Sequence, residues 1–249
     1  MALVNPIGAA VRQVNSATLG ALKEAKQSRA ENFTLTQQVL EMRPGNVTPL
    51  KVADYIRMAA EKKVPPVVFH VLSDKESHPD GGFTRLGRLG IAVEPQVFSK
   101  LTANRYDKSH PHLSYPKYVK YRRGAPPPAG FAKHPLDMSQ AERWLLFTGM
   151  AHLNFNAALQ ALSIGRFQTM VMHWKRMGFP SPLAMYQYAN QGEFEQLELC
   201  FKWFVMEDLV PEMRALNWAK IARYNGTGNI EAYEADCRKL CERRQPLYA

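Results

Sequence analysis

One segment combines the end of an apolar helix with a tight turn: Val71-Leu72-Ser73-Asp74-Lys75-Glu76-Ser77-His78-Pro79-Asp80-Gly81-Gly82-Phe83. The apolar residues 67–72 and the following turn, rich in proline and glycine, predict that a short buried helix ends near Glu76. A carboxyl group half in apolar packing and half in a cleft has a raised pKa, which makes it a general acid at neutral pH. Most glutamates at helix ends are simply solvated, so this position permits acid chemistry without establishing it.

Length and composition place the chain among ordinary globular proteins. Of its 249 residues, 46% are hydrophobic and 22% are charged, which suits one large domain or one domain with a small appendage. The sequence has neither an apolar run of about 18 residues nor the features of a secretory signal, so we expect synthesis in the cytoplasm. Neither the cysteines nor the histidines have the spacing of metal ligands, so we expect free thiols, no metal and no cofactor.

The chain is strongly basic, with a net charge of +10 and a pI near 9.6. Much of the excess lies in residues 100–133, where eight Lys and Arg stand against one Asp, interleaved with four tyrosines. A basic balance favours a polyanionic partner, which is nucleic acid, an anionic lipid surface or an anionic cell-wall polymer. Basic segments with aromatic side chains suit single-stranded nucleic acid, but the sequence contains no recognised nucleic-acid module.

Periodicity and breaking residues predict helices in the first part of the chain. Residues 9–43 are polar and helix-friendly, and Arg43-Pro44-Gly45-Asn46 breaks them off, which indicates an N-terminal helical extension. Thr48-Pro49 has the pattern that opens a second helix, and Pro65-Pro66 ends it and begins the next. Residues 83–94 are punctuated by glycine and partly alternating, which predicts a β-hairpin.

From Ser139 onward the sequence predicts further helices. Ser139 and Glu142 have the spacing of a capping box, Asn156 caps a short helix over residues 157–162, and residues 163–168 turn into another helix. Later helices are bounded by capping or breaking residues: Ser181-Pro182, Gly192, Asn217 and Asn225-Gly226. The expected fold class is therefore α+β, predominantly helical, with one small β-hairpin.

Five short motifs follow one another from residue 66 to the C-terminus: Lys75 to Phe83; Val93-Glu94-Pro95-Gln96-Val97-Phe98 with Leu101-Thr102; Arg105-Tyr106-Asp107 with His110 to Ser114; Ala157-Ala158-Leu159 with Ser163 to Met170; and Trp218 to Gly226. Each motif alone is weak. In this order and at this spacing, they resemble the N-acetylmuramidase domain of phage endolysins, a peptidoglycan-cleaving domain with a lysozyme-like fold.

The resemblance implies a catalytic domain over residues 46–249. The helical extension over residues 1–45 lies outside it and is either a targeting or wall-binding segment or a packing strap. It places the catalytic glutamate of the family on Glu76 and the second acidic position on Glu94, which a hairpin beside the cleft could bring opposite the first. Glycoside hydrolysis needs one acid for the glycosidic oxygen and one carboxylate for the oxocarbenium ion or a water. Glu94 is alternatively structural, and Asp80 is a rival for its role, although loop aspartates are usually turn formers.

The resemblance also places Gln168, Tyr224 and Asn225 along the substrate cleft. Neutral amides suit sugar hydroxyls and N-acetyl groups, and a tyrosine can stack on a sugar ring or hydrogen-bond to it. The simpler alternative for Asn225-Gly226 is a helix stop. The sequence departs from the family pattern at two places. Pro95-Gln96 replaces a basic pair beside Glu94, and Ile164 replaces a tryptophan, which changes either a cleft wall or core packing.

The resemblance implies a peptidoglycan muramidase that hydrolyses the β-1,4 bond between N-acetylmuramic acid and N-acetylglucosamine and so lyses bacteria. We expect a monomer whose segment Lys100 to Lys133 is drawn to anionic envelope polymers, with no nucleic-acid partner. An endolysin without a signal peptide acts in the periplasm after a separate partner has permeabilised the membrane. The alternative is a basic protein that binds nucleic acid or the envelope and carries a catalytically degenerate lytic domain.

Overall fold

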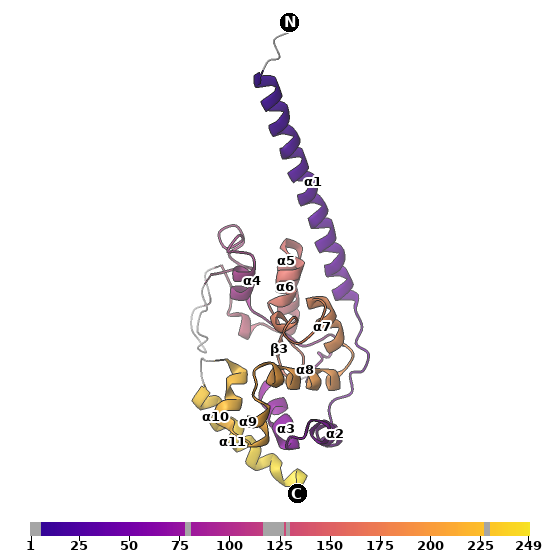
Figure 1. The fold of residues 1–249 in the computed structure, drawn as a ribbon, viewed down its shortest axis with the longest axis vertical. Coiled ribbons are helices and arrows are strands. Elements are labelled where there is room, and N and C mark those ends of the chain that lie inside the picture. The colour runs from indigo at the N-terminus through magenta and orange to yellow at the C-terminus, as the bar shows by residue number, and fades with distance from the viewer. Residues whose placement is uncertain (1–5, 78–80, 117–126, 128–129, 227–229) are drawn as a thin grey trace.

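The computed structural model describes residues 6–77, 81–116, 127, 130–226 and 230–249, with the side chains described from residue 23 onward except at residue 136 (Figure 1). The α-helices are α1 (Pro6–Glu41), α2 (Val52–Lys62), α3 (Pro66–Glu76), α4 (Pro95–Leu101), α5 (Gln140–Leu153), α6 (Phe155–Gln160), α7 (Pro182–Ala189), α8 (Glu193–Met206), α9 (Val210–Arg214), α10 (Trp218–Ile221) and α11 (Ile230–Arg244). The strands are β1 (Ile91–Val93), β2 (Leu162–Ile164) and β3 (Thr169–Met170). The short 3-10 helices are η1 (Pro135–Asp137), η2 (Val171–His173), η3 (Ala222–Asn225) and η4 (Gln245–Tyr248). Within the described parts of the chain, no helix has both the length and the apolar character needed to cross a membrane.

Two hydrophobic cores divide the molecule into two lobes. The sheet lobe comprises β1, β2, α4, α5, α6, α7 and the last turns of α1, and its core includes Ile91, Phe98 and Phe147. The helical lobe comprises α2, α3, α9, α10 and α11, and its core includes Phe69 and Trp218. Helix α8 packs into both cores and joins the lobes, and Figure 1 shows the two groups of helices on opposite sides of it. The predicted class, predominantly helical with a small antiparallel element, is confirmed.

Helix α3 forms where the sequence predicts it. Pro65 and Pro66 fix the entry of the chain, and Val67–Ser73 are all buried between α2 and α11. The helix ends at Glu76, so this carboxyl group stands at the border between the helical lobe and the loop that follows. The proline pair and the apolar run were therefore sufficient to predict the position of this helix.

Several other helix starts were predicted correctly and two were not. The capping box of Ser139 and Glu142 opens α5, and the Ser181 hydroxyl accepts the Ala184 backbone N–H at the start of α7. Helix α2 begins at Val52 with Lys51 as its N-cap, so the prediction at Thr48-Pro49 was wrong by about one turn. Helix α6 is capped by Asn154, whose side chain accepts the Ala157 N–H, instead of by Asn156.

The predicted hairpin over residues 83–94 is present only as a short chain reversal over residues 82–90, because β1 pairs with a distant strand. Phe83 and Leu89 form an antiparallel bridge, and the backbone N–H groups of Thr84 and Gly90 donate to the carbonyls of Arg88 and Gly82 at 2.7 and 2.9 Å. Strand β1 pairs antiparallel with β2, with Ala92 opposite Ser163, in a three-stranded sheet of order β1-β2-β3. The other edge of β1 is covered by α5, where the Gln140 amide bonds both the N–H and the carbonyl of Ile91 at 3.0 Å.

A hairpin lies beside the cleft in residues 162–170, where the sequence had predicted the end of one helix and a turn into the next. Strands β2 and β3 pair antiparallel, and the turn between them contains Gly165 at φ +71° and Gln168 at φ +49°. Residues with left-handed backbone conformations cannot continue a right-handed helix, so no helix runs through this turn. Gly165 is also needed for space, because a Cβ at this position would lie 2.5 Å from the Gln196 side chain. The side-chain amide oxygen of Gln196 accepts a hydrogen bond from the Arg166 backbone N–H at 2.7 Å and holds the turn against α8.

A buried polar network fixes the segment that follows Glu76. The Glu193 side chain is almost fully buried, and its carboxylate accepts the Arg166 guanidinium at 2.6 and 3.1 Å. The same carboxylate accepts the backbone N–H of Gly82 at 2.7 Å and of Leu50 at 3.0 Å. Because these partners come from three separate segments, Glu193 connects the β2–β3 turn, the loop after Glu76 and the start of α2.

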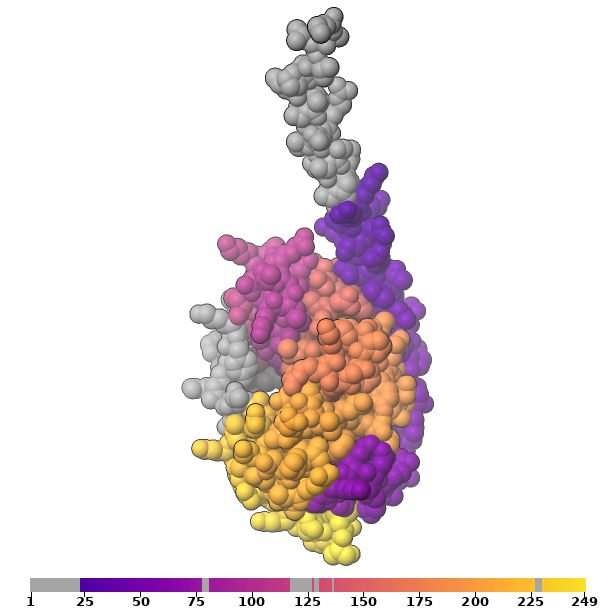
Figure 2. All heavy atoms as spheres, viewed as in Figure 1, coloured from indigo at the N-terminus to yellow at the C-terminus, as the bar shows by residue number. Residues whose placement is uncertain are grey.

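Helix α1 extends from the sheet lobe (Figure 2), and its last turns belong to the fold. Thr36 and Val39 are buried against α5 and α6, and the Asn32 amide bonds the Leu153 carbonyl and the Phe155 N–H at 3.3 Å. The described part of the helix before Asn32 is exposed. A targeting or wall-binding role for residues 1–45 stays a prediction.

Candidate active site

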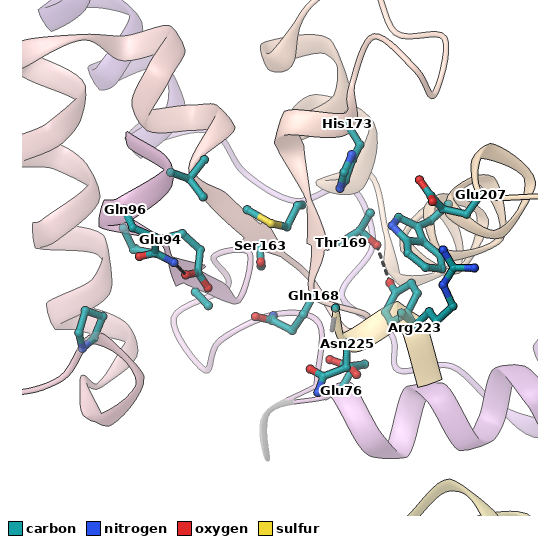
Figure 3. A pocket seen from close by; sticks show the side chains of 18 of the residues that line it. Glu76, Glu94, Gln96, Ser163, Gln168, Thr169, His173, Glu207, Arg223 and Asn225 are labelled. Carbon is teal, nitrogen blue, oxygen red and sulfur yellow. Dashed lines mark hydrogen bonds between the residues drawn. The ribbon is translucent and has the colours of Figure 1, made fainter. Parts of the chain in front are cut away.

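A pocket of about 610 Å³ lies between the two lobes and contains both predicted catalytic glutamates (Figure 3). Its walls come from α3, β1, α4, the β2–β3 hairpin, α8 and η3. The predicted substrate-binding side chains also line it: Gln168, Tyr224 and Asn225. The structure therefore brings together all five residues that the sequence had singled out from segments up to 149 positions apart.

Glu76 has the environment of a general acid. Burial raises the pKa of its carboxyl group to about 7, while the hydrogen bond from the Tyr233 hydroxyl and the charge of Lys75 act in the opposite direction. Lys75 is itself paired with Asp236 at 2.5 Å. The acid at the end of α3 is thus protonated in a large fraction of molecules at neutral pH and is held in place by a side chain from α11.

Glu94 is the N-cap residue of α4 and sits directly after β1. Burial raises the pKa of its carboxyl group, and the hydrogen bond from the Gln96 amide and the positive charge of Arg143 lower it. Arg143 belongs to α5 and also bonds the Ile91 carbonyl at 3.0 Å. This chain has Pro95-Gln96 where the family motif has two basic residues beside the glutamate. A positive charge near Glu94 is nevertheless present, because Arg143, 49 positions further along the chain, supplies it.

The two glutamates face the same cavity from different lobes. Figure 3 shows Glu94 with Gln96 on one side and Glu76 on another, with Ser163 and Gln168 between them. One group is an acid near neutrality and the other is a carboxyl group with a cationic neighbour. The arrangement is chemically capable of donating a proton from one wall while a carboxylate acts from another.

Gln168 and Asn225 are polar residues at the centre of the pocket, and Tyr224 is more firmly tied to the protein. The Gln168 side chain donates to the Gly165 carbonyl at 2.7 Å. The Tyr224 hydroxyl donates to the Phe167 carbonyl at 2.7 Å and lies 3.0 Å from the Thr169 hydroxyl. Its ring stacks on Phe204 with the centroids 5.4 Å apart. Tyr224 thus fastens the hairpin to η3, and a sugar contact by these three residues stays a prediction.

Sequence reasoning missed several side chains of the pocket and the partner of the acid. The missed residues of the pocket are Tyr115, Gln96, Ser163, Thr169, His173, Trp203, Glu207 and Arg223. Tyr233 was identified only as part of the last helix, and nothing local marks it as a partner of Glu76. Ser163 and Gln96 lie within recognised motifs, so the motifs could have identified them, whereas α8 and η2 lie outside every motif.

Two further expectations are resolved only in part. Ile164 is 1% exposed in the core of the sheet lobe, so its replacement of the tryptophan of the family changes packing and not the cleft wall. The rival residue Asp80 lies outside the described residues, as do Lys117, Lys120, Arg122 and Arg123 of the basic segment. Among the side chains that are described, no group of three or more His, Cys, Asp or Glu could hold a metal ion.

The fold and the site together define a lysozyme-like protein, mostly helical, with a small sheet beside a cleft that carries two carboxyl groups. The N-acetylmuramidase family model matches residues 65–245, and the chain belongs to this family. It is a family of glycoside hydrolases, and the match begins at the proline pair that opens α3.

The comparison with solved structures gives the same fold. The crystal structure of the Burkholderia AP3 phage endolysin matches with a TM-score of 0.65 and 26% sequence identity. The match covers 81% of this chain and 72% of that one. A comparison with curated proteins found no match.

Proposed function

We propose that this protein is a peptidoglycan muramidase of the endolysin type, which hydrolyses the β-1,4 bond from N-acetylmuramic acid to N-acetylglucosamine. The observation that supports it most directly is Glu76. This carboxyl group has a pKa of about 7, stands at the edge of a cleft and is oriented by Tyr233. The family match and the likeness to a phage endolysin support the same substrate.

In the proposed reaction, Glu76 donates its proton to the glycosidic oxygen as the bond to the anomeric carbon breaks. The leaving sugar departs as the alcohol, and positive charge develops on the ring of the other sugar. Protonation matters because an expelled alkoxide is a poor leaving group, whereas a nearby acid with a pKa near the working pH transfers its proton readily.

Glu94 would supply the second carboxylate. Arg143 favours its ionised form against the effect of burial, and the Gln96 amide fixes its orientation. It either attacks the anomeric carbon, which retains configuration, or activates a water, which inverts it. The anomer released first, measured by NMR, distinguishes these two roles.

The biological setting follows from the same proposal. Cleavage of the glycan strands would weaken the wall and lyse the cell, once a separate partner has permeabilised the membrane and given access to the periplasm. The basic segment Lys100 to Lys133 would hold the enzyme near anionic envelope polymers, because its excess positive charge attracts polyanions at moderate salt.

The test is digestion of purified peptidoglycan, followed by mass spectrometry of the products and by turbidity loss of permeabilised bacteria. Wild type should release fragments with new reducing muramic ends. Glu76→Gln keeps the size and the hydrogen-bonding oxygen but cannot donate an acidic proton, so the rate should fall by about 10²–10⁴. The exposed Glu231→Gln on α11 serves as the matched control and should keep wild-type activity.

Two outcomes would overturn the proposal. If wild type binds peptidoglycan but produces no reducing muramic ends, the chain is a binding protein with a degenerate lytic domain. If Glu76→Gln lyses cells as fast as wild type, the acid has been assigned to the wrong residue.

A further inference from the structure

The pocket continues beyond the two glutamates to a wall that the proposed chemistry does not use. This wall, here called the arginine end, is formed by His173 of η2, Trp203 of α8, Glu207 directly after α8, and Arg223 of η3. Figure 3 shows Arg223, Glu207 and His173 on the side of the pocket away from Glu94 and Gln96. A glycan strand of neutral sugars gives no reason for charged side chains in this place.

Among the described residues of the arginine end, the acidic side chain is paired and one cation, Arg223, is not. Glu207 is paired with Arg176 at 2.7 Å, and the same guanidinium donates to the Met206 carbonyl at 3.0 Å. Burial and the charge of Arg176 lower the pKa of His173 against the charge of Glu207, and so disfavour the charged form of its ring. Arg223 is exposed, and within the described part of the chain no acceptor or carboxylate pairs with its guanidinium. The surplus charge of this wall is therefore positive and open to a ligand.

We propose that Arg223 binds a carboxylate of the peptide stem that N-acetylmuramic acid carries, which makes this end of the cleft a subsite for the peptide. A guanidinium presents paired N–H donors that match the two oxygens of a carboxylate. The intact polymer supplies such groups only through its stem peptides, because the lactyl carboxyl of the sugar is tied up in the amide to the peptide. Trp203 gives the peptide an apolar wall beside the cation, and His173 adds an imidazole ring that can hydrogen-bond to the peptide backbone.

The position of Arg223 in the chain couples this subsite to the reaction centre. Arg223 directly precedes Tyr224, whose hydroxyl bonds the β2–β3 hairpin, and Asn225, which lines the pocket with Glu76. A stem peptide held by Arg223 would thus keep its muramyl sugar beside the acid. This inference rests on the proposed muramidase function and adds the part of the substrate that the glycan chemistry leaves undefined.

The experiment compares Arg223→Met with wild type on three forms of one peptidoglycan preparation. The forms are the intact polymer, the polymer with its stem carboxylates amidated by carbodiimide and methylamine, and strands stripped of peptides by an amidase. The measured quantity is kcat/KM for release of reducing muramic ends. Arg243→Met is the matched control, because Arg243 is exposed on the last turn of α11 and lies outside the pocket.

On intact polymer, Arg223→Met should lower kcat/KM by about tenfold, the size expected for a hydrogen bond to a charged group. The loss in kcat/KM should be smaller on amidated polymer and on stripped strands. The kcat/KM of Arg243→Met, divided by that of wild type, should be the same on all three forms. If Arg223→Met loses the same fraction of kcat/KM on intact and on amidated polymer, the inference is overturned, while the proposed muramidase function stands. A loss confined to stripped strands would also overturn it, because the ligand is then the lactyl carboxylate. Absence of reducing ends in every wild-type digest removes the proposed function, and the inference with it.

Discussion

The two lobes hold their glutamates in different ways. In the helical lobe, Glu76 ends a helix of which seven residues are buried, and the preceding residue, Lys75, is paired with Asp236. In the sheet lobe, Glu94 follows a three-residue strand and lies near the cation of Arg143. Burial raises the pKa of both carboxyl groups, and in each case a hydrogen bond and a cation act in the opposite direction: Tyr233 and Lys75 for Glu76, Gln96 and Arg143 for Glu94. An acid paired with a carboxylate requires two carboxyl groups in one cleft with different neighbours.

The strongest test of this comparison is Glu94→Gln. The amide keeps the shape and an oxygen that accepts from Gln96 but cannot carry a negative charge, so we expect kcat to fall by about 10²–10⁴ with little change in KM. Steady-state kinetics on soluble peptidoglycan fragments measure both parameters, with Glu231→Gln as the control. An unchanged kcat with a lowered unfolding midpoint would assign Glu94 a structural role only.

The connection between the lobes is tested by Glu193→Ala. This change leaves the Arg166 guanidinium and the backbone N–H groups of Gly82 and Leu50 without their shared acceptor. Removing one partner of a buried ion pair destabilises proteins by about 3–5 kcal/mol, so the midpoint of urea unfolding should fall accordingly. Glu231→Ala, an exposed glutamate outside the network, should stay within about 0.5 kcal/mol of wild type. Equal midpoints for the two variants would show that the network does not hold the lobes together.

The pH dependence of the reaction tests the environment of Glu76. Because burial raises its pKa to about 7, the acid form is lost as pH rises through that value, and kcat/KM should fall about tenfold per pH unit above it. Tyr233→Phe removes a hydrogen bond that favours the charged carboxylate, so the pKa should rise and the decline should begin at higher pH.

The control for this shift is Tyr248→Phe. This variant loses a hydroxyl group that lies outside the pocket and is hydrogen-bonded to His70 at 2.8 Å. Each variant should lose about 1 kcal/mol of stability, but only Tyr233→Phe should move the pH profile. The folded-state pKa of Glu76 lies above its ordinary value of 4.5, so its contribution to stability is fully present below that value and is lost as pH rises through 7. Circular dichroism at each pH shows whether the protein is still folded, and so separates a loss of stability from deprotonation of Glu76. A decline at the same pH in Tyr233→Phe and wild type would contradict the role of Tyr233.

Local patterns predicted the elements that depend on neighbours in sequence. The proline pair before α3, the capping box of α5 and the serine cap of α7 are local hydrogen bonds and backbone constraints, so they appear directly in the residues. Residues 162–170 were misread for the same reason. They lie between two helical segments, and the strand pairing and the contact of their turn with Gln196 come from residues further along the chain.

The sequence by itself determined that a buried helix ends at Glu76, that Glu94 follows an apolar stretch, and that the motifs from residue 66 onward belong to one family. Tertiary structure alone decided that β1 pairs with β2, that Tyr233 holds the acid, and that Arg143 supplies the cation beside Glu94. The physical reason is distance along the chain. A cap or a helix end is fixed by residues within one turn, whereas these partners lie 49 to 157 positions apart, and no local period encodes which of them will meet.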